Sequence, residues 1–229
     1  MSTGVAIVAG AGGALGRATA EILADDGLTV VAVDRNQDAL AGLSAGIRRE
    51  VADATSRAEA EKLAGRLAAE IGPAEVLVNT IGAFSPGDAL ATTAEELELM
   101  VGVNLAPALW LSQAVAPQMT ERGRGAIVHT TARPGIEPSA GMAAYSISKA
   151  ALAQLTRVLD VELRQHGIRV NAVAPQLLDT ELNRAAFPAE MMARAASPAS
   201  VARVIAFLVS DAAAPVSGAI VPAYGALGG

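Results

Sequence analysis

The sequence predicts an α/β protein in which a parallel β-sheet carries helices on both faces, formed by one domain over residues 1–229. Short apolar runs rich in valine and isoleucine alternate along the chain with longer segments whose apolar residues repeat at helical spacing. Strands that alternate with helices are joined by crossovers, which produce a parallel sheet covered on both faces. No linker, repeat or low-complexity segment divides the chain.

Four strands and two helices are expected in the first part of the chain. The strands are residues 5–9, 28–33, 47–51 and 76–78, of which the third is the weakest. The helices are residues 14–26 and 56–71. Ser56 is a suitable N-cap for the second helix, and Gly72 with Pro73 ends it.

The second part of the chain continues the alternation. A long helix over 93–121 precedes a strand over 126–131, and the next helix carries Tyr145 and Lys149 and runs to about His166. A strand over 168–174, a helix over 199–210 and a short strand over 219–221 complete the prediction. Seven strands separated by helices again indicate a doubly covered parallel sheet.

Composition indicates a large core and argues against several classes of partner. Hydrophobic residues make up 52% of the chain and charged residues 17%, which suggests that apolar surface is buried between subunits of a dimer or tetramer. The formal net charge of −6 argues against nucleic acid. There is no cysteine, and His129 and His166 lack the spacing of metal ligands, so no metal site is expected.

The sequence also lacks the usual signals of membrane attachment and export. No uninterrupted apolar run approaches the ~18 residues that span a bilayer. The first residues have no basic segment of the kind that opens a signal peptide. We therefore expect a cytoplasmic protein without a membrane partner.

A glycine cluster joins the first strand to the first helix. It includes Gly10, Gly13, Ala14, Leu15 and Gly16. Backbone that approaches a pyrophosphate closely cannot carry side chains, and a helix N-terminus offers free N–H groups and a partial positive charge. The strand–turn–helix context favours a dinucleotide site. The alternative is a tight turn that only needs the flexibility of glycine.

Asp34 ends the second expected strand, about twenty residues after the cluster. A carboxylate there accepts hydrogen bonds from both ribose hydroxyls and repels a 2′-phosphate, which favours NAD(H). Arg35 weighs against that choice, because a guanidinium pairs with the phosphate of NADP(H). Asp34 could also cap the following helix, a role compatible with ribose binding.

Further groups are expected at the same edge of the sheet. Asp53 and Ala54 follow the third strand, where they could bind the adenine, and Asn79 to Gly82 follow the fourth. Ligands collect at the carboxyl edge of open parallel sheets. We therefore expect these residues to take part in cofactor binding.

Tyr145 and Lys149 are one helical turn apart, so the phenol and the ammonium lie on one face. A tyrosine ordinarily titrates near ~10, which is too high for efficient proton transfer at neutral pH. A fixed positive charge beside it favours the phenolate and lowers its pKa. The pair is a candidate acid–base centre; the alternative is a surface lysine and a half-buried tyrosine at a chance spacing.

Taken together, these residues resemble the short-chain dehydrogenase/reductase (SDR) family over essentially the whole chain. The matching segments are the 10–16 cluster, Asp53, 79–82, Asn104, Tyr145 with Lys149, 171–175 and Gly218. The resemblance implies a Rossmann-type sheet of seven parallel strands and a NAD(P)(H) cofactor. It also implies hydride transfer to or from a carbonyl, imine or alcohol of a small-molecule substrate.

The resemblance assigns roles to individual residues. Tyr145 would be the acid–base, and Lys149 would bind the nicotinamide ribose and lower the pKa of Tyr145. Asn104 would hold a water that links Lys149 to solvent. The carboxamide end of the cofactor would be bound by the segment after the sixth strand, which includes Pro175, Leu178 and Thr180.

Three residues depart from the family's pattern. Ala14 replaces the middle glycine of the cofactor turn, and Gln176 replaces the glycine that follows the proline. The position of the family's catalytic serine is occupied by Ala132, whose methyl group cannot hydrogen-bond a substrate oxygen. Thr131 could replace that serine only if the strand has already ended, because neighbouring strand residues point to opposite faces.

Several departures resemble the dihydropteridine reductase branch of the family. They include Ala132 with Arg133, Gly141 with Met142, and the stretch 178–184. That branch also has alanine at the serine position and uses NADH. A dihydropteridine-type reductase is therefore one alternative activity. A cofactor-binding protein with lost or weak catalysis is another, because the usual serine is missing.

Residues 176–198 are expected to form a substrate lid, because they follow a strand at the ligand edge and contain Phe187, Met191 and Met192. The alternative is a helix that packs these side chains into the core. The resemblance implies a dimer contact through the helices near 95–121 and 143–166. It also implies a second subunit contact at the C-terminal residues 223–229.

Overall fold

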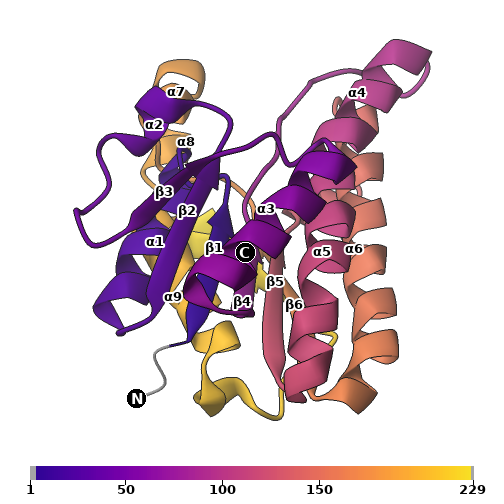
Figure 1. Cartoon of the computed structure of the whole chain (residues 1–229). Helices are drawn as coiled ribbons and strands as arrows, with labels where there is room; N and C mark the ends of the chain where they lie inside the picture. Colours follow the sequence, from indigo (N-terminus) through magenta and orange to yellow (C-terminus); the bar gives the residue numbers. More distant parts are fainter. Residues whose placement is uncertain (1–3, 228–229) are drawn as a thin grey trace.

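Seven strands form one parallel sheet in the order β3-β2-β1-β4-β5-β6-β7, with helices on both faces (Figure 1). This arrangement, seen in a computed structural model that describes residues 4–227, confirms the predicted Rossmann-type α/β fold. The strands are β1 (Val5–Ala9), β2 (Thr29–Asp34), β3 (Arg48–Val51), β4 (Ala74–Asn79), β5 (Gly125–Thr130), β6 (Ile168–Pro175) and β7 (Ile220–Ala223).

Burial along the strands follows their position in the sheet. Every residue of β1 is buried, and β2, β4, β5 and β6 are buried over most of their length. Strands covered on both faces need apolar side chains on both sides, which explains their continuous apolar runs. The edge strand β3 alternates half-buried and exposed residues, and this accounts for its weak sequence signal.

Two layers of helices cover the sheet, and each faces its own core. One layer contains α1 and α9, and the other contains α3, α5 and α6 (Figure 1). Alternate strand residues supply the two cores, so Val8 packs in the first and Ile7 in the second. The helices are α1 (Ala14–Asp25), α3 (Arg57–Ile71), α5 (Ala106–Arg122), α6 (Ala143–Leu163) and α9 (Pro198–Val209).

The single helix expected over 93–121 is divided in the structure, so that expectation was wrong. α4 (Ala94–Asn104) ends just before Leu105, and α5 begins just after it. Pro107 has no N–H, so the carbonyl four residues earlier loses its helical partner. The Asn104 side chain is also bonded to Ala83 in a neighbouring loop, which holds the end of α4 in place.

Residues 94–122, which form α4 and α5, have the length and apolar composition of a membrane-crossing helix, with a hydropathy of 1.5. However, 44% of its most apolar 18-residue stretch is buried inside the protein. α5 contributes Leu111, Val115 and Met119 to the second core. Helices in the core of a soluble protein can have the same length and apolar composition, so this segment is only weak evidence for a membrane span.

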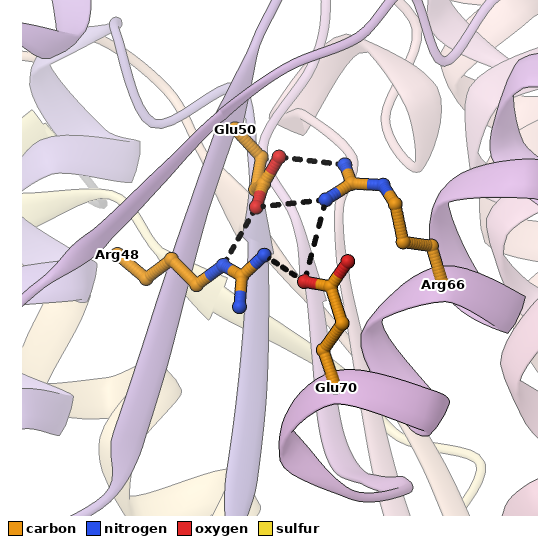
Figure 2. Close-up of polar contacts among 4 residues, drawn as sticks. All are labelled: Arg48, Glu50, Arg66 and Glu70. Carbon is orange, nitrogen blue, oxygen red and sulfur yellow. Dashed lines mark hydrogen bonds and ion pairs between the residues drawn. The ribbon is translucent and has the colours of Figure 1, made fainter.

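Four charged side chains join the edge strand β3 to α3 (Figure 2). Glu50 accepts a hydrogen bond from Arg48 Nε at 2.6 Å and bonds from Arg66 at 2.6 and 3.2 Å. Arg48 also pairs with Glu70, which lies 3.6 Å from Arg66. The hydrogen bond from Arg66 is the largest cause that holds the pKa of Glu50 below its ordinary value.

Glu50→Gln is expected to lower the free energy of unfolding by about 1 kcal/mol at neutral pH, because the carboxylate is well shielded and pairs with two arginines. Folding lowers the pKa of Glu50, so this contribution is present above its ordinary value of 4.5 and is lost as the pH falls below it. Urea unfolding at neutral and acidic pH measures both effects.

Glu61→Gln is the matched control, because Glu61 forms an exposed pair with Arg57 on the same helix. It should change the free energy of unfolding by less than ~0.5 kcal/mol. Equal losses in the two variants would show that the Glu50 contacts contribute no more than a surface ion pair.

Candidate active site

The strand order reverses between β1 and β4, and the carboxyl ends of both strands meet there. Thr80, just after β4, donates its N–H to the Ala9 carbonyl at 2.9 Å, and its hydroxyl lies 3.2 Å from the Gly10 carbonyl oxygen. Gly10 has φ of +80°, and a Cβ on it would lie 2.8 Å from the Thr80 hydroxyl oxygen. Ligands of open parallel sheets bind at such a reversal.

The glycine cluster leaves the N-terminus of α1 bare. Gly13 is the N-cap and makes no side-chain bond to the first turn, which begins with Ala14 and Leu15. A Cβ on Gly16 would lie 2.2 Å from the Gly10 carbonyl oxygen, so the turn packs closely against the helix. Backbone N–H groups and the positive end of the helix dipole therefore face the edge, and this cradle fits a pyrophosphate.

Asp34 contacts the glycine turn from the end of β2. Its Oδ2 accepts from the Gly12 N–H and its Oδ1 from the Asn36 N–H, both at 3.0 Å. The N-cap of α2 (Gln37–Leu40) is Asn36, so Asp34 does not take the capping role considered above. The half-buried carboxylate lies beside the cradle, with exposed Arg35 next to it, a position that suits a ribose.

Asp53 and Ala54 lie just past the carboxyl end of β3. Asp53 accepts bonds from the Thr55 hydroxyl at 2.7 Å and the Thr55 N–H at 3.0 Å. The bond from the Thr55 side chain is the largest cause of a lowered pKa at Asp53, so this carboxyl stays ionised. Ala54 is buried beneath the turn. The two residues thus offer an acceptor and a small apolar contact at the edge.

Asn79, which was expected to take part in cofactor binding, lies at the end of β4. It is fully buried at the end of β4, where its Oδ1 accepts from the Ile81 N–H at 3.2 Å. Its Nδ2 has no hydrogen-bond partner in the described part of the chain. The bond from the Ile81 N–H ties the side chain to the turn that leads to Gly82.

Tyr145 and Lys149 lie one turn apart near the start of α6, as their spacing predicts. The Tyr145 ring packs edge-on against Phe84, with 5.1 Å between the ring centroids. Lys149 is 4% exposed, and its Nζ lies 6.0 Å from the centre of the Tyr145 ring. The same Nζ donates to the Thr130 carbonyl at 2.9 Å. The pair therefore shares one site, in which Lys149 is buried and Tyr145 is half-buried.

Burial sets the pKa values of both groups. It raises the pKa of Tyr145 to about 12 and lowers the pKa of Lys149 to about 8. The expected lowering of the Tyr145 pKa by Lys149 is not found in this arrangement. The Lys149 ammonium is turned toward the Thr130 carbonyl, and the loss of water around the phenol disfavours its charged form.

Asn104 connects the end of α4 to this centre. Its Oδ1 accepts from the Ala83 N–H at 2.9 Å, and its Nδ2 donates to the Ala83 carbonyl and to Ser148 Oγ, each at 3.0 Å. Gly82 precedes this contact, and a Cβ on it would lie 2.8 Å from Asn104 Oδ1 and 2.9 Å from Lys149 Nζ. The structure thus brings together Gly82, Asn104 and Lys149, which are far apart in the sequence.

Thr131 is not available to replace the missing serine. β5 ends at Thr130, so Thr131 lies just past the strand, although its N–H still bonds to the Val173 carbonyl at 2.9 Å. However, Thr131 is 2% exposed, and its hydroxyl donates to the Lys149 carbonyl at 2.7 Å. This bond ties the end of β5 to α6. Ala132, the next residue, is buried and has no hydroxyl.

A polar cluster beside Ala132 was not foreseen from the sequence. Arg133 pairs through Nε with Glu137 at 2.6 Å and donates through Nη1 to Gln176 Oε1 at 2.7 Å. The guanidinium lies 4.8 Å from the centre of the Tyr224 ring, and the Tyr224 hydroxyl bonds to Glu137 at 3.0 Å. Three segments that are distant in the sequence meet in this cluster. Gln176, which replaces the glycine of the family's pattern, was the one sign of it in the sequence.

The segment expected to form a lid, residues 176–198, contains two short helices. Thr180 caps α7 (Glu181–Ala186) by accepting the Asn183 N–H, and Leu178 forms a β-bridge with Ala196 after Pro175 ends β6. In α8 (Ala189–Met192), Met191 is 39% exposed while Met192 is 9% exposed. One methionine of the segment thus packs inward and the other is exposed.

His129, one of the two histidines, lies inside the protein near Ser112. His129 is fully buried, and burial, followed by the charge of Lys149, lowers its pKa to about 4, so the ring is neutral at neutral pH. Its Nε2 lies 3.4 Å from Ser112 Oγ. Within residues 4–227, no group of three or more His, Cys, Asp or Glu side chains is placed to hold a metal ion.

Gly82→Ala is expected to lower the free energy of unfolding by about 1–3 kcal/mol, because the added Cβ would displace the buried Asn104 amide or the Lys149 ammonium. Urea denaturation measures the loss. Gly87→Ala is the control, because no heavy atom lies within 4 Å of its added Cβ. A Gly82 variant as stable as the Gly87 variant would contradict this packing.

Comparison with known proteins agrees with this geometry. The short chain dehydrogenase family model matches residues 4–191. Galactitol 2-dehydrogenase of Rhizobium johnstonii is 37% identical over 94% of this chain and 91% of its own length, and meso-2,3-butanediol dehydrogenase of Serratia marcescens is 29% identical over 96% and 93%. The structure of a short-chain type dehydrogenase/reductase from Mycobacterium ulcerans matches with a TM-score of 0.92 at 26% identity, covering 99% of this chain and 90% of that one. The chain therefore belongs to the short-chain dehydrogenase/reductase family, whose members are oxidoreductases that use NAD(P)(H).

Proposed function

We propose that this oxidoreductase transfers hydride between NAD(H) and a small carbonyl, alcohol or imine-like substrate, with Tyr145 as the acid–base. The supporting observation is that Tyr145, Lys149 and Asn104 gather at the sheet edge where the glycine turn leaves the N-terminus of α1 bare. The names of the two relatives, dehydrogenases of galactitol and of meso-2,3-butanediol, favour a secondary alcohol of a polyol or diol.

The bound nicotinamide would supply the hydride or accept it. In reduction, the Tyr145 hydroxyl gives its proton to the substrate oxygen as that oxygen gains charge; in oxidation, the phenolate takes the proton of the alcohol. Lys149 turns from the Thr130 carbonyl toward the phenol and the ribose, so that its charge stabilises the phenolate. Asn104 fixes the loop at Gly82 and holds the water that links Lys149 to solvent.

Cofactor binding is assigned to residues along the same edge. Asp34 binds the adenosine ribose, and Asp53 with Ala54 contacts the adenine. Lys149 and Gly82 lie at the nicotinamide ribose. The pyrophosphate is held by the cradle of Gly10, Gly13, Ala14, Leu15 and Gly16, and the nicotinamide end by Pro175, Leu178 and Thr180.

Ala132 gives a specific reason to test a second activity. A quinonoid dihydropterin is a conjugated imine-like ring, and its reduction depends less on a serine that positions a ketone oxygen. Dihydropteridine-type reduction is therefore the second candidate, with Tyr145 still as the proton donor. A cofactor-binding protein with weak or lost catalysis is the third.

Wild-type protein is expected to consume NADH with at least one member of a panel of diketones, quinones and quinonoid dihydropterin, or to reduce NAD with polyols and diols. Tyr145→Phe should lower kcat by at least about 100-fold, because the proton donor is removed while the ring that packs on Phe84 stays. The absorbance of the reduced nicotinamide measures the rates of NADH consumption and NAD reduction in the wild type and the variant. A Tyr145→Phe variant as active as the wild type would refute the mechanism.

NADH is expected to bind more tightly than NADPH, because the Asp34 carboxylate favours ribose hydroxyls and repels a 2′-phosphate. Asp34→Asn should weaken NADH binding about tenfold and narrow the difference between the two cofactors. Fluorescence titration measures both dissociation constants. Asp38→Asn, an exposed carboxylate in α2, is the control. A clear NADPH preference in the wild type would overturn the assignment and point to Arg35.

We also infer that the chain self-associates as a dimer or tetramer. α4 and α6 carry exposed apolar side chains, with Leu99 58%, Ile147 52% and Val161 74% exposed.

Residues 176–198 act as a lid on a single domain. We further propose a cytoplasmic protein whose partners are small molecules and its own copies; the net charge of −6 argues against nucleic acid.

A further inference from the structure

We propose that Gln176 supplies the hydrogen-bond donor for the substrate oxygen at the position where Ala132 lacks one, and that Arg133 holds the Gln176 amide in the required orientation. This inference rests on the proposed oxidoreductase function. It deepens that function by naming the group that positions the substrate oxygen opposite Tyr145.

The pairing of β5 with β6 places Gln176 beside Ala132. Thr130 pairs with Val173 in the parallel register, and the Thr131 N–H continues the ladder to the Val173 carbonyl at 2.9 Å. The two strands therefore leave the edge side by side. The residues that follow them are also neighbours: Ala132 and Arg133 come after β5, and Pro175 and Gln176 lie at the end of β6. The contact between Arg133 and Gln176 demonstrates this.

Arg133 determines which end of the amide is available. Its Nη1 donates to Gln176 Oε1 at 2.7 Å, and a guanidinium has donors only, so the oxygen of the amide must face Arg133. The amide nitrogen Nε2, with two N–H donors, then points away from Arg133. Within residues 4–227, Nε2 makes no hydrogen bond to the protein, and Gln176 is only half-buried. The amide thus keeps a pair of donors on a residue that leaves the same edge of the sheet as Ala132.

The guanidinium that orients Gln176 is itself held from two sides. Glu137 binds Nε at 2.6 Å, and the Tyr224 ring lies against the guanidinium plane at 4.8 Å. Tyr224 also bonds to Glu137 at 3.0 Å, which closes a ring of contacts. A donor whose orientation is set before the substrate arrives costs little reorganisation during the reaction.

The other hydroxyls near Ala132 are not offered to a substrate. Thr131 donates to the Lys149 carbonyl. The Thr130 hydroxyl is buried without a partner in the described residues, and so is that of Ser146 in α6. Gln176 is therefore the polar side chain next to Ala132 with a donor that is neither bonded nor buried.

The test uses the substrate for which the wild type is most active in the panel above. Gln176→Ala should lower kcat/KM by about 100-fold, the lower end of the range found when one preorganised donor is removed, while the Kd for NADH stays within about twofold. Adding Ala132→Ser to Gln176→Ala should restore at least about half of the lost activity on a logarithmic scale, because a serine hydroxyl then takes over. Gln165→Ala, which changes an exposed glutamine just after the C-terminal end of α6, should match the wild type.

Arg133 is tested as a positioning residue. Arg133→Met should lower kcat more than it raises KM, and Ala132→Ser should rescue this variant as well, since the hydroxyl does not depend on the orientation of the amide. A purely structural role of Arg133 would show no rescue. Urea unfolding of each variant identifies any that fail to fold, and the Ala132→Ser rescue then reports on the folded ones.

Three results would overturn the proposal. Gln176→Ala could match the wild type in kcat/KM, or it could weaken NADH binding without changing kcat, which would assign Gln176 to the cofactor. Ala132→Ser could also fail to rescue Gln176→Ala. If the wild type turns over no substrate, the proposed function fails and this inference fails with it; an active wild type beside an unaffected Gln176 variant refutes the donor alone.

Discussion

The parallel pairing of β1 with β2 and β4 is the constraint on which the whole site depends. In a parallel sheet all carboxyl ends lie at one edge, so each strand delivers the residue that follows it to the same place. Gly10, Asp34, Thr80 and Ala132 leave four different strands there. No single segment of the chain carries the chemistry, and any loss of register would separate these groups.

The burial of ionisable groups is the second constraint. It disfavours charged side chains, but it also strengthens the contacts that charges make. Burial raises the pKa of Tyr145 and lowers the pKa of Lys149, so it favours the neutral form of each side chain. This opposes the charge separation that a phenolate–ammonium pair needs. The same exclusion of water strengthens any electrostatic contact formed inside the site. In the structure the Lys149 ammonium donates to the Thr130 carbonyl, so under the proposed mechanism its side chain would have to turn before its charge could act on the phenol.

The parts of the protein that could be predicted from the sequence are those set by local pattern. The fully buried β1 is a continuous apolar run, and Tyr145 with Lys149 is one helical turn, so both were found. The break at Leu105 was missed because the apolar pattern continues across it, although Pro107 removes a helical hydrogen bond. The cluster of Arg133 with Gln176 could not be predicted, because three segments that are far apart in the sequence meet only in the folded sheet.

The charged contacts between β3 and α3 also affect how copies of this protein meet. β3 is an outer strand, and an outer strand offers unpaired backbone groups on which a strand of another molecule can add. This one is four residues long and carries Arg48, Arg49 and Glu50, so an incoming strand would have to place its own side chains against fixed charges of both signs. These charges disfavour growth of the sheet at β3, and the proposed association of subunits would use the exposed apolar side chains of α4 and α6 instead.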